Sequence, residues 1–389
     1  MNSKSENWKY RFLIGIMTAS NCFASSYGTY YLLNNGISDF QAGIIIAIAN
    51  ILSTVVAPAL GRVADKSKKW SAKTLLAALS LFECLLALTL ICIPNVFVVA
   101  IVYCLLVSNV YIITPLANAL TFQYKRHKIQ IDFGVARGFG SLIYAVVTFF
   151  LGKCTDLWGT ISIPIACIFV YVFVFVMALK VLPAEPIFTN NVVKTVKTSR
   201  KGFIKKYPIF FLMIVGIMLV LIFHNMVMVY FIHIVEEVGC GATEMGYAVA
   251  LGAFVEIPML FLYTKLNKRI KTATLLFVAM FSFFVKGIIL CFAFNILMVY
   301  LAQLFAFSSF GLMAAARVYY AHEMVDPEDE VTGQSLMNTT DTIALLCASF
   351  IGGVLMSYFG QIQVLLIVGT TISLIGVIIV ATCAIKGRK

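Results

Sequence analysis

The chain has 389 residues, of which 61% are hydrophobic and only 12% are charged. Soluble domains carry about twice that charged fraction and seldom contain apolar runs of about 18 residues or more, whereas this chain contains about a dozen such runs. The composition excludes a soluble globular protein and predicts an all-α membrane protein embedded in a lipid bilayer.

The net charge of +12 would suit a nucleic-acid-binding protein only if the cations shared a soluble surface. Instead, all but three of the 29 Lys and Arg residues fall in the amino terminus, the even-numbered loops and their flanks, or the carboxyl tail. The exceptions are Lys153 near an odd-numbered loop, and Arg137 and Lys286 inside apolar runs. This positive-inside asymmetry predicts both termini in the cytoplasm and a place in the cytoplasmic membrane. Anionic lipid accounts for the charge, so we expect no nucleic-acid partner.

The first apolar run, Tyr10–Leu33, is too long for the apolar region of a signal peptide and lacks a small-residue cleavage site, so it is predicted to be a span. The twelve predicted spans are 10–33, 39–61, 72–93, 96–121, 134–156, 160–182, 208–234, 243–264, 272–293, 296–320, 332–357 and 361–385. The segment between the sixth and seventh spans carries six Lys and Arg against one acid. We therefore expect an N-terminal six-helix bundle at 1–182, a basic cytoplasmic linker at 183–207 and a C-terminal six-helix bundle at 208–389.

The two halves share a pattern of glycines. Four pairs recur at a spacing of 203 or 201 residues: Gly36 and Gly239, Gly43 and Gly246, Gly152 and Gly353, and Gly159 and Gly360. A twofold internal repeat in a twelve-span protein is typical of a transporter whose halves move around a site at the membrane midplane.

Arg137 lies about one helical turn inside the fifth apolar run, flanked by Gly134, Gly138 and Gly140. A charge at the centre of a membrane helix costs about 2.5–3.5 kcal/mol, so it persists only where it faces water, a partner or a ligand. Small residues let neighbouring helices approach closely and surround the guanidinium. We interpret Arg137 as part of a substrate site inside the bundle. The alternative is that it binds backbone carbonyls and only fixes helix packing.

Acids inside spans are candidates for proton coupling, because a desolvated carboxyl group can take up and release a proton near neutral pH. The clear cases are Glu83, Glu256 and Asp341. Asp341 shares a helix face with Asn338, the repeat counterpart of Arg137, and both are expected to face a cavity. For Glu256 the alternative is a structural hydrogen bond beside the helix proline.

Polar side chains also mark the first and seventh spans. Thr18, Asn21 and Ser25 form one stripe, and His224, the repeat counterpart of Asn21, is followed by Asn225. The pKa of a histidine suits a proton relay, although an isolated histidine in a helix bundle is more often a satisfied packing residue. We assign Asn21, His224 and Asn225 to the candidate substrate site.

The segment Tyr30–Lys69 resembles the opening of a major facilitator superfamily transporter. Five positions match the superfamily motif G-x-x-x-D-R/K-x-G-R-R/K: Gly61, Asp65, Lys66, Lys68 and Lys69. Ser67 and the absent later glycine depart from it. A carboxylate near the start of the next helix can cap helix ends and lock the halves in one state, so Gly61, Asp65 and Lys66 are predicted to act in gating. The alternative for Asp65 is a solvated loop charge.

Further motifs resemble the oligosaccharide:proton and nucleoside:proton symporter branch, which includes lactose permease. They are PLANAL (115–120), FGVARGFGS (133–141), EIP (256–258), HEMVDPEDEVTGQSL (322–336) and IGGVL (351–355). The resemblance implies twelve helices in two pseudo-symmetric bundles. It places Arg137 on the sugar-binding arginine and Tyr144, on the same helix face, on the stacking tryptophan. Asn118 replaces the acidic partner found in the fourth span.

The same resemblance places the third and ninth spans at the periphery. For the repeat counterparts Glu83 and Lys286 we therefore expect structural pairing within each half. The acidic run Glu328–Glu330 is expected to be a solvated loop.

These observations predict a secondary active transporter that imports a small polar solute (a sugar, glycoside or nucleoside) by alternating access, as a functional monomer driven by a proton gradient. No cofactor, metal or disulfide is expected, because the ten cysteines are scattered singly and form no C-x-x-C pair.

The alternative function is proton-driven efflux of drugs or metabolites. Such antiporters usually carry an arginine inside the fourth span and a G-P-x-x-G-G run in the fifth, and this sequence has neither. A sensor that binds a solute without moving it is a third possibility. A membrane enzyme has least support, since the sequence shows no catalytic triad, metal cluster or phosphate loop.

Overall fold

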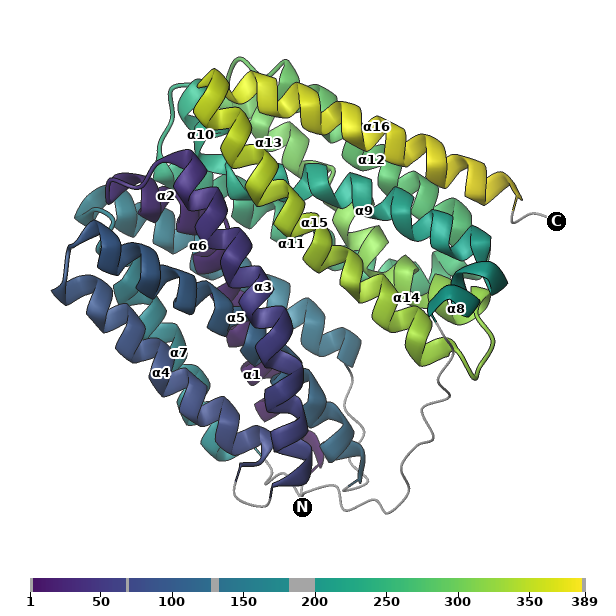
Figure 1. Ribbon diagram of the computed structural model, residues 1–389, viewed down its shortest axis with the longest axis horizontal. Helices are drawn as coiled ribbons and strands as arrows, with labels where there is room; N and C mark the ends of the chain where they lie inside the picture. Colours follow the sequence, from purple (N-terminus) through teal and green to yellow (C-terminus); the bar gives the residue numbers. More distant parts are fainter. Residues whose placement is uncertain (1–2, 68–69, 127–132, 182–199, 387–389) are drawn as a thin grey trace. The chain divides into compact units, whose positions relative to one another are not determined.

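A computed structural model describes residues 3–67, 70–126, 133–181 and 200–386 of the chain, and every regular element in these ranges is a helix (Figure 1). The helices are α1 (Ser3–Ala24), α2 (Ser26–Asn34), α3 (Asp39–Lys66), α4 (Ala72–Cys92), α5 (Val96–Arg126), α6 (Phe133–Trp158), α7 (Ser162–Lys180), α8 (Arg200–Lys206), α9 (Pro208–Val229), α10 (Phe231–Glu237), α11 (Ala242–Asn267), α12 (Thr272–Cys291), α13 (Ile296–Leu304), the π-helix η1 (Phe307–Gly311), α14 (Leu312–Met324), α15 (Glu330–Phe359) and α16 (Ile362–Lys386).

Eleven helical segments in the described ranges are long and apolar enough to cross a membrane, and they match the second to the twelfth predicted spans. The first predicted span instead forms two helices, α1 and α2, which meet at Ser25. The Ser25 hydroxyl donates to the Asn21 carbonyl at 2.9 Å, a side-chain bond that competes with the helix backbone and bends it. Beside the break, the Tyr103 hydroxyl donates to the Phe23 carbonyl. A single apolar run in the sequence does not reveal such a break.

The chain divides into two compact units, Met1–Phe188 with Cys240–Phe254, and Thr189–Gly239 with Val255–Lys389. Helix α11 therefore begins in the first unit and ends in the second. Of the predicted linker 183–207, only 200–207 lie within the described residues; they form α8 and the residue that precedes α9.

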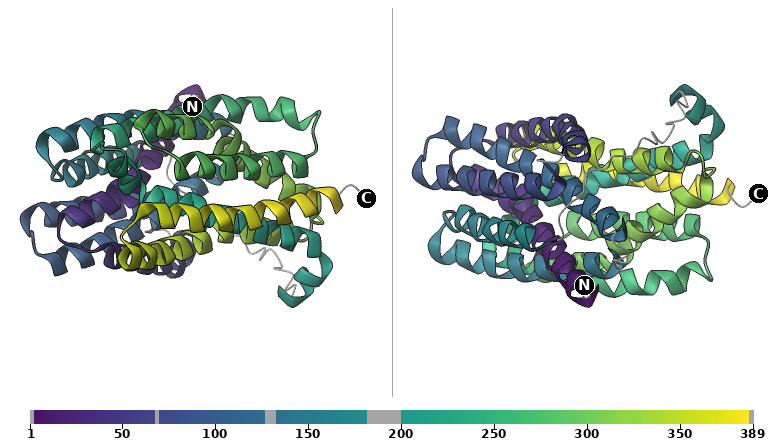
Figure 2. Two further views of the ribbon diagram at one scale, coloured as in Figure 1. Left: turned by 90° about the horizontal axis from the view of Figure 1, so that it is seen from above. Right: turned by 90° about the horizontal axis from the view of Figure 1, so that it is seen from below.

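Equivalent helices pack in equivalent ways inside the two units. Figure 2 shows long helices running alongside one another within each unit. The first span packs on the fifth, as α1 on α6 and as α9 on α15. The third span packs on the sixth, as α4 on α7 and as α12 on α16. The repeat that the glycine spacing predicts is therefore present in the tertiary structure.

A matched tyrosine bond joins the first and fifth spans of each half. The Tyr27 hydroxyl donates to the Thr148 carbonyl at 2.8 Å, and 203 residues later the Tyr230 hydroxyl donates to the Ser349 carbonyl, also at 2.8 Å. In both halves the tyrosine lies at or just after the point where the first span is broken. The broken first span and its tyrosine are thus features of the repeated unit.

The repeated glycines are required by the backbone at two turns of each half. In the described ranges, every glycine with a positive φ belongs to the repeat: Gly36 (79°), Gly159 (75°), Gly239 (77°) and Gly360 (63°). A residue with a Cβ adopts this left-handed region at a steric cost, so the turns conserve the same residue type in both halves of the chain.

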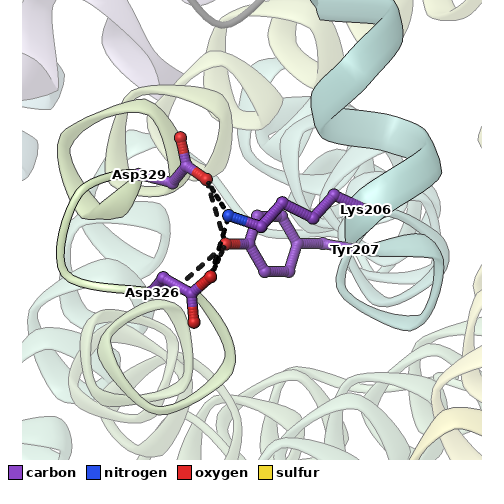
Figure 3. A network of polar contacts seen from close by, with 4 residues as sticks. All are labelled: Lys206, Tyr207, Asp326 and Asp329. Atoms are coloured by element: carbon purple, nitrogen blue, oxygen red, sulfur yellow. Dashed lines mark hydrogen bonds and ion pairs between the residues drawn. The ribbon is translucent and has the colours of Figure 1, made fainter. Parts of the chain in front are cut away.

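A network of four polar side chains fastens the start of α9 to the segment between α14 and α15 in the second unit (Figure 3). The Lys206 ammonium lies 2.8 Å from Asp326 Oδ2 and 2.9 Å from Asp329 Oδ2. The Tyr207 hydroxyl lies 2.8 Å and 3.0 Å from the same two oxygens and accepts a hydrogen bond from the Asp326 backbone N–H at 3.2 Å. The expectation of a wholly solvated acidic run at 328–330 is therefore wrong for Asp329, whose side chain is 4% exposed because it turns inward to this network.

The charges of the network stabilise one another. Hydrogen bonds from Lys206 and then Tyr207 hold the pKa of Asp326 below its ordinary value, and hydrogen bonds to Asp326 and Asp329 raise the pKa of Lys206 above its own. An acid whose folded-state pKa is depressed stabilises the fold above its unfolded pKa, and this contribution is lost as the pH falls through the folded value. A lysine whose folded-state pKa is raised stabilises the fold below its unfolded-state pKa. This stabilisation is lost as the pH rises through the folded-state pKa.

We predict that Asp329→Asn lowers the melting temperature of the purified protein more than Asp326→Asn does. Asp329 is buried, so its loss leaves Lys206 without its inner partner, whereas the Asp326 side chain is 61% exposed and already shares its interaction with water. Thermal unfolding followed by intrinsic fluorescence between acid and alkaline pH measures the effect. The gap between wild type and Asp329→Asn should be widest near neutral pH. An equal melting temperature for all three proteins would refute a stabilising role for the network.

Candidate solute and coupling residues

Arg137 lies in the second turn of α6 and is half-buried. One turn further on, Gly140 packs against α1 so closely that a Cβ there would lie 2.6 Å from Thr18 Oγ1. Gly15 on α1 packs equally closely, because its Cβ would lie 2.5 Å from the Ile143 side chain. The expectation that a small residue beside Arg137 lets a neighbouring helix approach is confirmed for Gly140.

The polar stripe of α1 lies on this same packed helix. Thr18 donates to the Ile14 carbonyl at 2.8 Å, and the Asn21 amide donates to the Thr18 carbonyl at 3.1 Å. These bonds hold the stripe against its own helix, and Asn21 remains half-buried. The first unit therefore brings Arg137 and the stripe onto neighbouring helices. Asn118, by contrast, is exposed on α5.

Tyr144 packs at the contact between α6 and the first part of α11. It lies half-buried against a small cluster formed by Ala145, Ala250 and Ala253, together with Phe149. The neighbours of the ring in this cluster are therefore mainly small side chains. More than a hundred residues separate Tyr144 from Ala250 and Ala253, so no local sequence pattern predicts this contact.

An aromatic pair that the sequence did not single out follows along the same contact. The rings of Phe149 and Tyr247 stack with centroids 4.7 Å apart. The ammonium of Lys153 lies 5.1 Å from the centroid of Phe149 and 5.6 Å from that of Tyr247, within the range of a cation–π interaction. Lys153, the cation near an odd-numbered loop, therefore lies over two aromatic rings.

Two of the repeated glycines make the approach of α6 and α11 possible. A Cβ at Gly152 would lie 2.5 Å from the Ala242 carbonyl, and a Cβ at Gly246 would lie 2.6 Å from the Thr148 carbonyl. At the end of this contact the backbone N–H of Thr243 donates to Asp156 Oδ2 at 2.9 Å, so the carboxylate satisfies the amino-terminal end of α11.

In the second unit, His224 is held between two aromatic rings of neighbouring spans. Its ring centroid lies 5.1 Å from that of Phe283 and 5.3 Å from that of Phe310. Its buried Nδ1 has no hydrogen-bond partner among the residues that the structure describes. Asn225, the next residue, is half-buried. The immediate surroundings of His224 are thus aromatic, and its assignment to the substrate site remains a prediction.

Glu256 lies where α11 meets the π-helix η1. A Cβ at Gly311, the last residue of η1, would lie 3.1 Å from both the Cβ and the carbonyl oxygen of Glu256. The Glu256 carboxyl group also acts electrostatically on Lys286 of α12, whose ammonium donates to Gln303 Oε1 at 2.9 Å. Short π-helical segments occur frequently at functional sites. The second unit therefore gathers a carboxyl group, an ammonium and a distorted helix at one place.

Asp341 forms an ion pair that the sequence analysis did not anticipate. Its Oδ1 lies 2.6 Å from Nη1 of Arg317, with the Arg317 side chain 13% exposed and that of Asp341 43% exposed. The charge pattern of the sequence predicts a position for Arg317 at the flank of a cytoplasmic loop, but Arg317 lies inside α14. The sequence does hold a signal for this placement, because the predicted span 296–320 includes position 317 and so puts a cation inside a membrane helix. Asn338, one turn before Asp341, is exposed.

Of the three predicted gating residues, the structure describes Gly61 fully and only the backbone of the other two. Gly61 lies near the end of α3, where a Cβ would meet nothing within 4 Å. Asp65 and Lys66 complete α3, but their side chains lie outside the described residues. Their role in gating stays a prediction. Within the described ranges, no group of three or more His, Cys, Asp or Glu side chains is placed to hold a metal ion.

The fold of this chain is similar to those of several solved transporters. The chain is similar to two structures of the nucleoside transporter NupG, one of them of a single-substitution mutant, with 12% and 14% sequence identity. Each covers 98% of this chain, and this chain covers 100% and 99% of theirs, with TM-scores of 0.80 and 0.78. The chain is also similar to a bacterial homologue of the human lysosomal transporter Spinster, with 10% sequence identity and a TM-score of 0.72. The match covers 98% of this chain and 97% of the homologue. At such identities the likeness concerns the fold alone.

A search among curated proteins returns no sequence match. The sequence profile of the MFS_1 like family matches residues 8–379, nearly the whole chain. The chain therefore belongs to the MFS_1 like family and is a multi-pass membrane transporter of the major facilitator fold, not an enzyme.

Proposed function

We propose that the chain imports a small polar solute across the cytoplasmic membrane by alternating access, with a nucleoside as the first candidate and a sugar or glycoside as the others. The observation that carries the proposal is the position of Arg137, half-buried on α6 where Gly140 packs against the polar stripe of α1. A guanidinium supplies several donors in a fixed geometry for the hydroxyl groups of a ribose or sugar. Tyr144 offers a ring face to a base or a sugar ring.

The structural likeness to NupG supports the choice of a nucleoside as the first solute to test, because its solved structures are of a nucleoside transporter. Asn21 and Asn118 of the first unit, and His224, Asn225 and Asn338 of the second, complete the proposed binding set. The positive-inside pattern of the sequence supports both termini in the cytoplasm. We infer that one chain suffices for transport, since each half carries its own share of these residues.

We further propose that protons drive the import through Glu256 and Asp341. Protonation of Asp341 would neutralise the carboxylate that now pairs with Arg317, and protonation of Glu256 would remove its attraction to Lys286. A proton shifts a conformational equilibrium only if the two states bind it with different affinity. A carboxylate that has a cationic partner in one state and lacks it in the other satisfies that condition.

Arg137→Ala is predicted to weaken solute binding by about 10–150-fold, the loss expected for a hydrogen bond to a charged group. Arg137→Lys should also bind weakly, because one ammonium cannot reproduce the guanidinium fork. Thermal-shift titration of the purified proteins with nucleosides measures the change, since a ligand that prefers the native state raises the melting temperature. Arg269→Ala, at an exposed arginine beyond α11, serves as the control and should bind normally. Wild-type affinity in either Arg137 variant would contradict the proposed site.

Glu256→Gln and Asp341→Asn are predicted to exchange solute across the membrane but to lose uphill accumulation. Each substitution fixes the position in a neutral form, so proton binding can no longer bias the two states. Uptake into proteoliposomes with and without an imposed pH gradient separates the two activities. Glu328→Gln, at an exposed loop acid, should accumulate solute like the wild type. Accumulation by both coupling variants would mean that the driving ion binds elsewhere.

A further inference from the structure

Glu83 is a fully buried acid that the proposed transport mechanism does not use. It lies on α4 with none of its surface exposed. Its Oε2 accepts a hydrogen bond from the Asn109 amide of α5 at 2.6 Å. Its Oε1 lies 4.0 Å from the thiol of Cys167 on α7. Among the residues that the structure describes, no lysine, arginine or histidine forms an ion pair with Glu83.

The groups around Glu83 from each packed helix are neutral or acidic. Cys167 of α7 contacts it, and Cys84 is the next residue of its own helix. Tyr171 of α7 and Tyr103 of α5 lie in its electrostatic neighbourhood. An isolated carboxylate in such surroundings is costly to bury, and the ordinary resolution of that cost is to keep the group neutral. A buried charge that persists is paired with an opposite charge, which this site does not supply.

The repeat provides an internal comparison. Lys286 occupies the position 203 residues after Glu83, and it too is bound by an amide from the fourth span of its half, Gln303, at 2.9 Å. Lys286 has the Glu256 carboxyl group in its electrostatic neighbourhood. The expected structural pairing within each half is therefore present as an amide contact in both halves. Within the ranges that the structure describes, it is the ionisable group of the second half that also has a counter-charge nearby.

Two buried oxygens near Glu83 keep unused hydrogen-bonding capacity. Among the described residues, Asn109 Oδ1 has no hydrogen-bond partner. The two N–H bonds of the same side-chain amide are both used, one to Glu83 and one to the Leu79 carbonyl at 3.0 Å. The Tyr171 hydroxyl has no partner of full hydrogen-bond geometry. Ser20 of α1 approaches Tyr171, and its own hydroxyl donates to the Met17 carbonyl at 2.7 Å. Tyr171 is thus a polar side chain that lies in the electrostatic neighbourhood of Glu83 and beside Ser20, the residue before Asn21.

We propose that Glu83 is a proton-binding site of the first unit, a carboxylic acid that carries an exchangeable proton on Oε1. On release, the proton passes from Oε1 to the Tyr171 hydroxyl and on toward Ser20, and the carboxylate that remains is held by the Asn109 amide. The site is separate from Glu256 and Asp341, and its existence does not depend on which solute is carried.

Infrared spectroscopy of the full-length protein in lipid nanodiscs tests this proposal without any transport assay. At neutral pH the wild type should show a carbonyl-stretch band of a protonated carboxylic acid that Glu83→Gln lacks and that the loop control Glu328→Gln retains. Glu83→Asp, which keeps an acid at the position, should move the band rather than remove it. In D₂O the wild-type band should shift to lower frequency as the proton exchanges, and Tyr171→Phe should slow that shift several-fold.

Three outcomes would overturn the proposal. Identical spectra for wild type, Glu83→Gln and Glu83→Asp would mean that Glu83 is ionised. A band that fails to shift in D₂O would mean that the proton is sealed in place and serves only the fold. A band that disappears when sodium chloride replaces choline chloride at constant pH would mean that the site takes Na⁺ instead of a proton.

Discussion

An ionisable side chain inside a membrane-spanning helix must be satisfied by groups within reach, because no water is available in the hydrocarbon region to do so. This constraint explains the polar chemistry of the chain better than any single motif. The structure meets it in three ways: an acid bound by an amide at Glu83, an ammonium bound by an amide and near a carboxyl group at Lys286, and an ion pair between Arg317 and Asp341. The three arrangements differ in whether the ionisable group has an opposite charge beside it.

The two halves share a scaffold and differ in these polar groups. Both have a broken first span, a tyrosine that binds a carbonyl of the fifth span, and positive-φ glycines at matching turns. Against this common framework, the third span carries an acid in one half and a base in the other. A repeat of this kind lets one packing arrangement hold two sets of ionisable groups that can be tuned independently. The broken first spans also free backbone carbonyls for side-chain hydroxyls, as at Phe23.

Much of the architecture follows from the sequence, because a span needs a minimum apolar length and the loops between spans need Gly, Pro or charge. The glycine spacing also predicted the repeat, and Gly140 beside Arg137 predicted a close helix contact. What the sequence did not reveal depends on contacts between residues far apart in the chain. The Arg317–Asp341 pair, the ring contacts of Lys153 and the burial of Asp329 are all of this kind. The break at Ser25 and the π-helix η1 are local, but an apolar run looks the same whether its helix is continuous or broken.

In the proposed mechanism, the chain moves its solute by exposing one binding site alternately to the two sides of the membrane. Counterflow in proteoliposomes tests it most directly, because it needs no ion gradient and no knowledge of the driving ion. Vesicles loaded with an unlabelled nucleoside and diluted into a trace of the labelled compound should transiently accumulate label, whereas unloaded vesicles should not. Nucleoside binding by the purified protein together with no counterflow would contradict the account and would indicate a solute sensor.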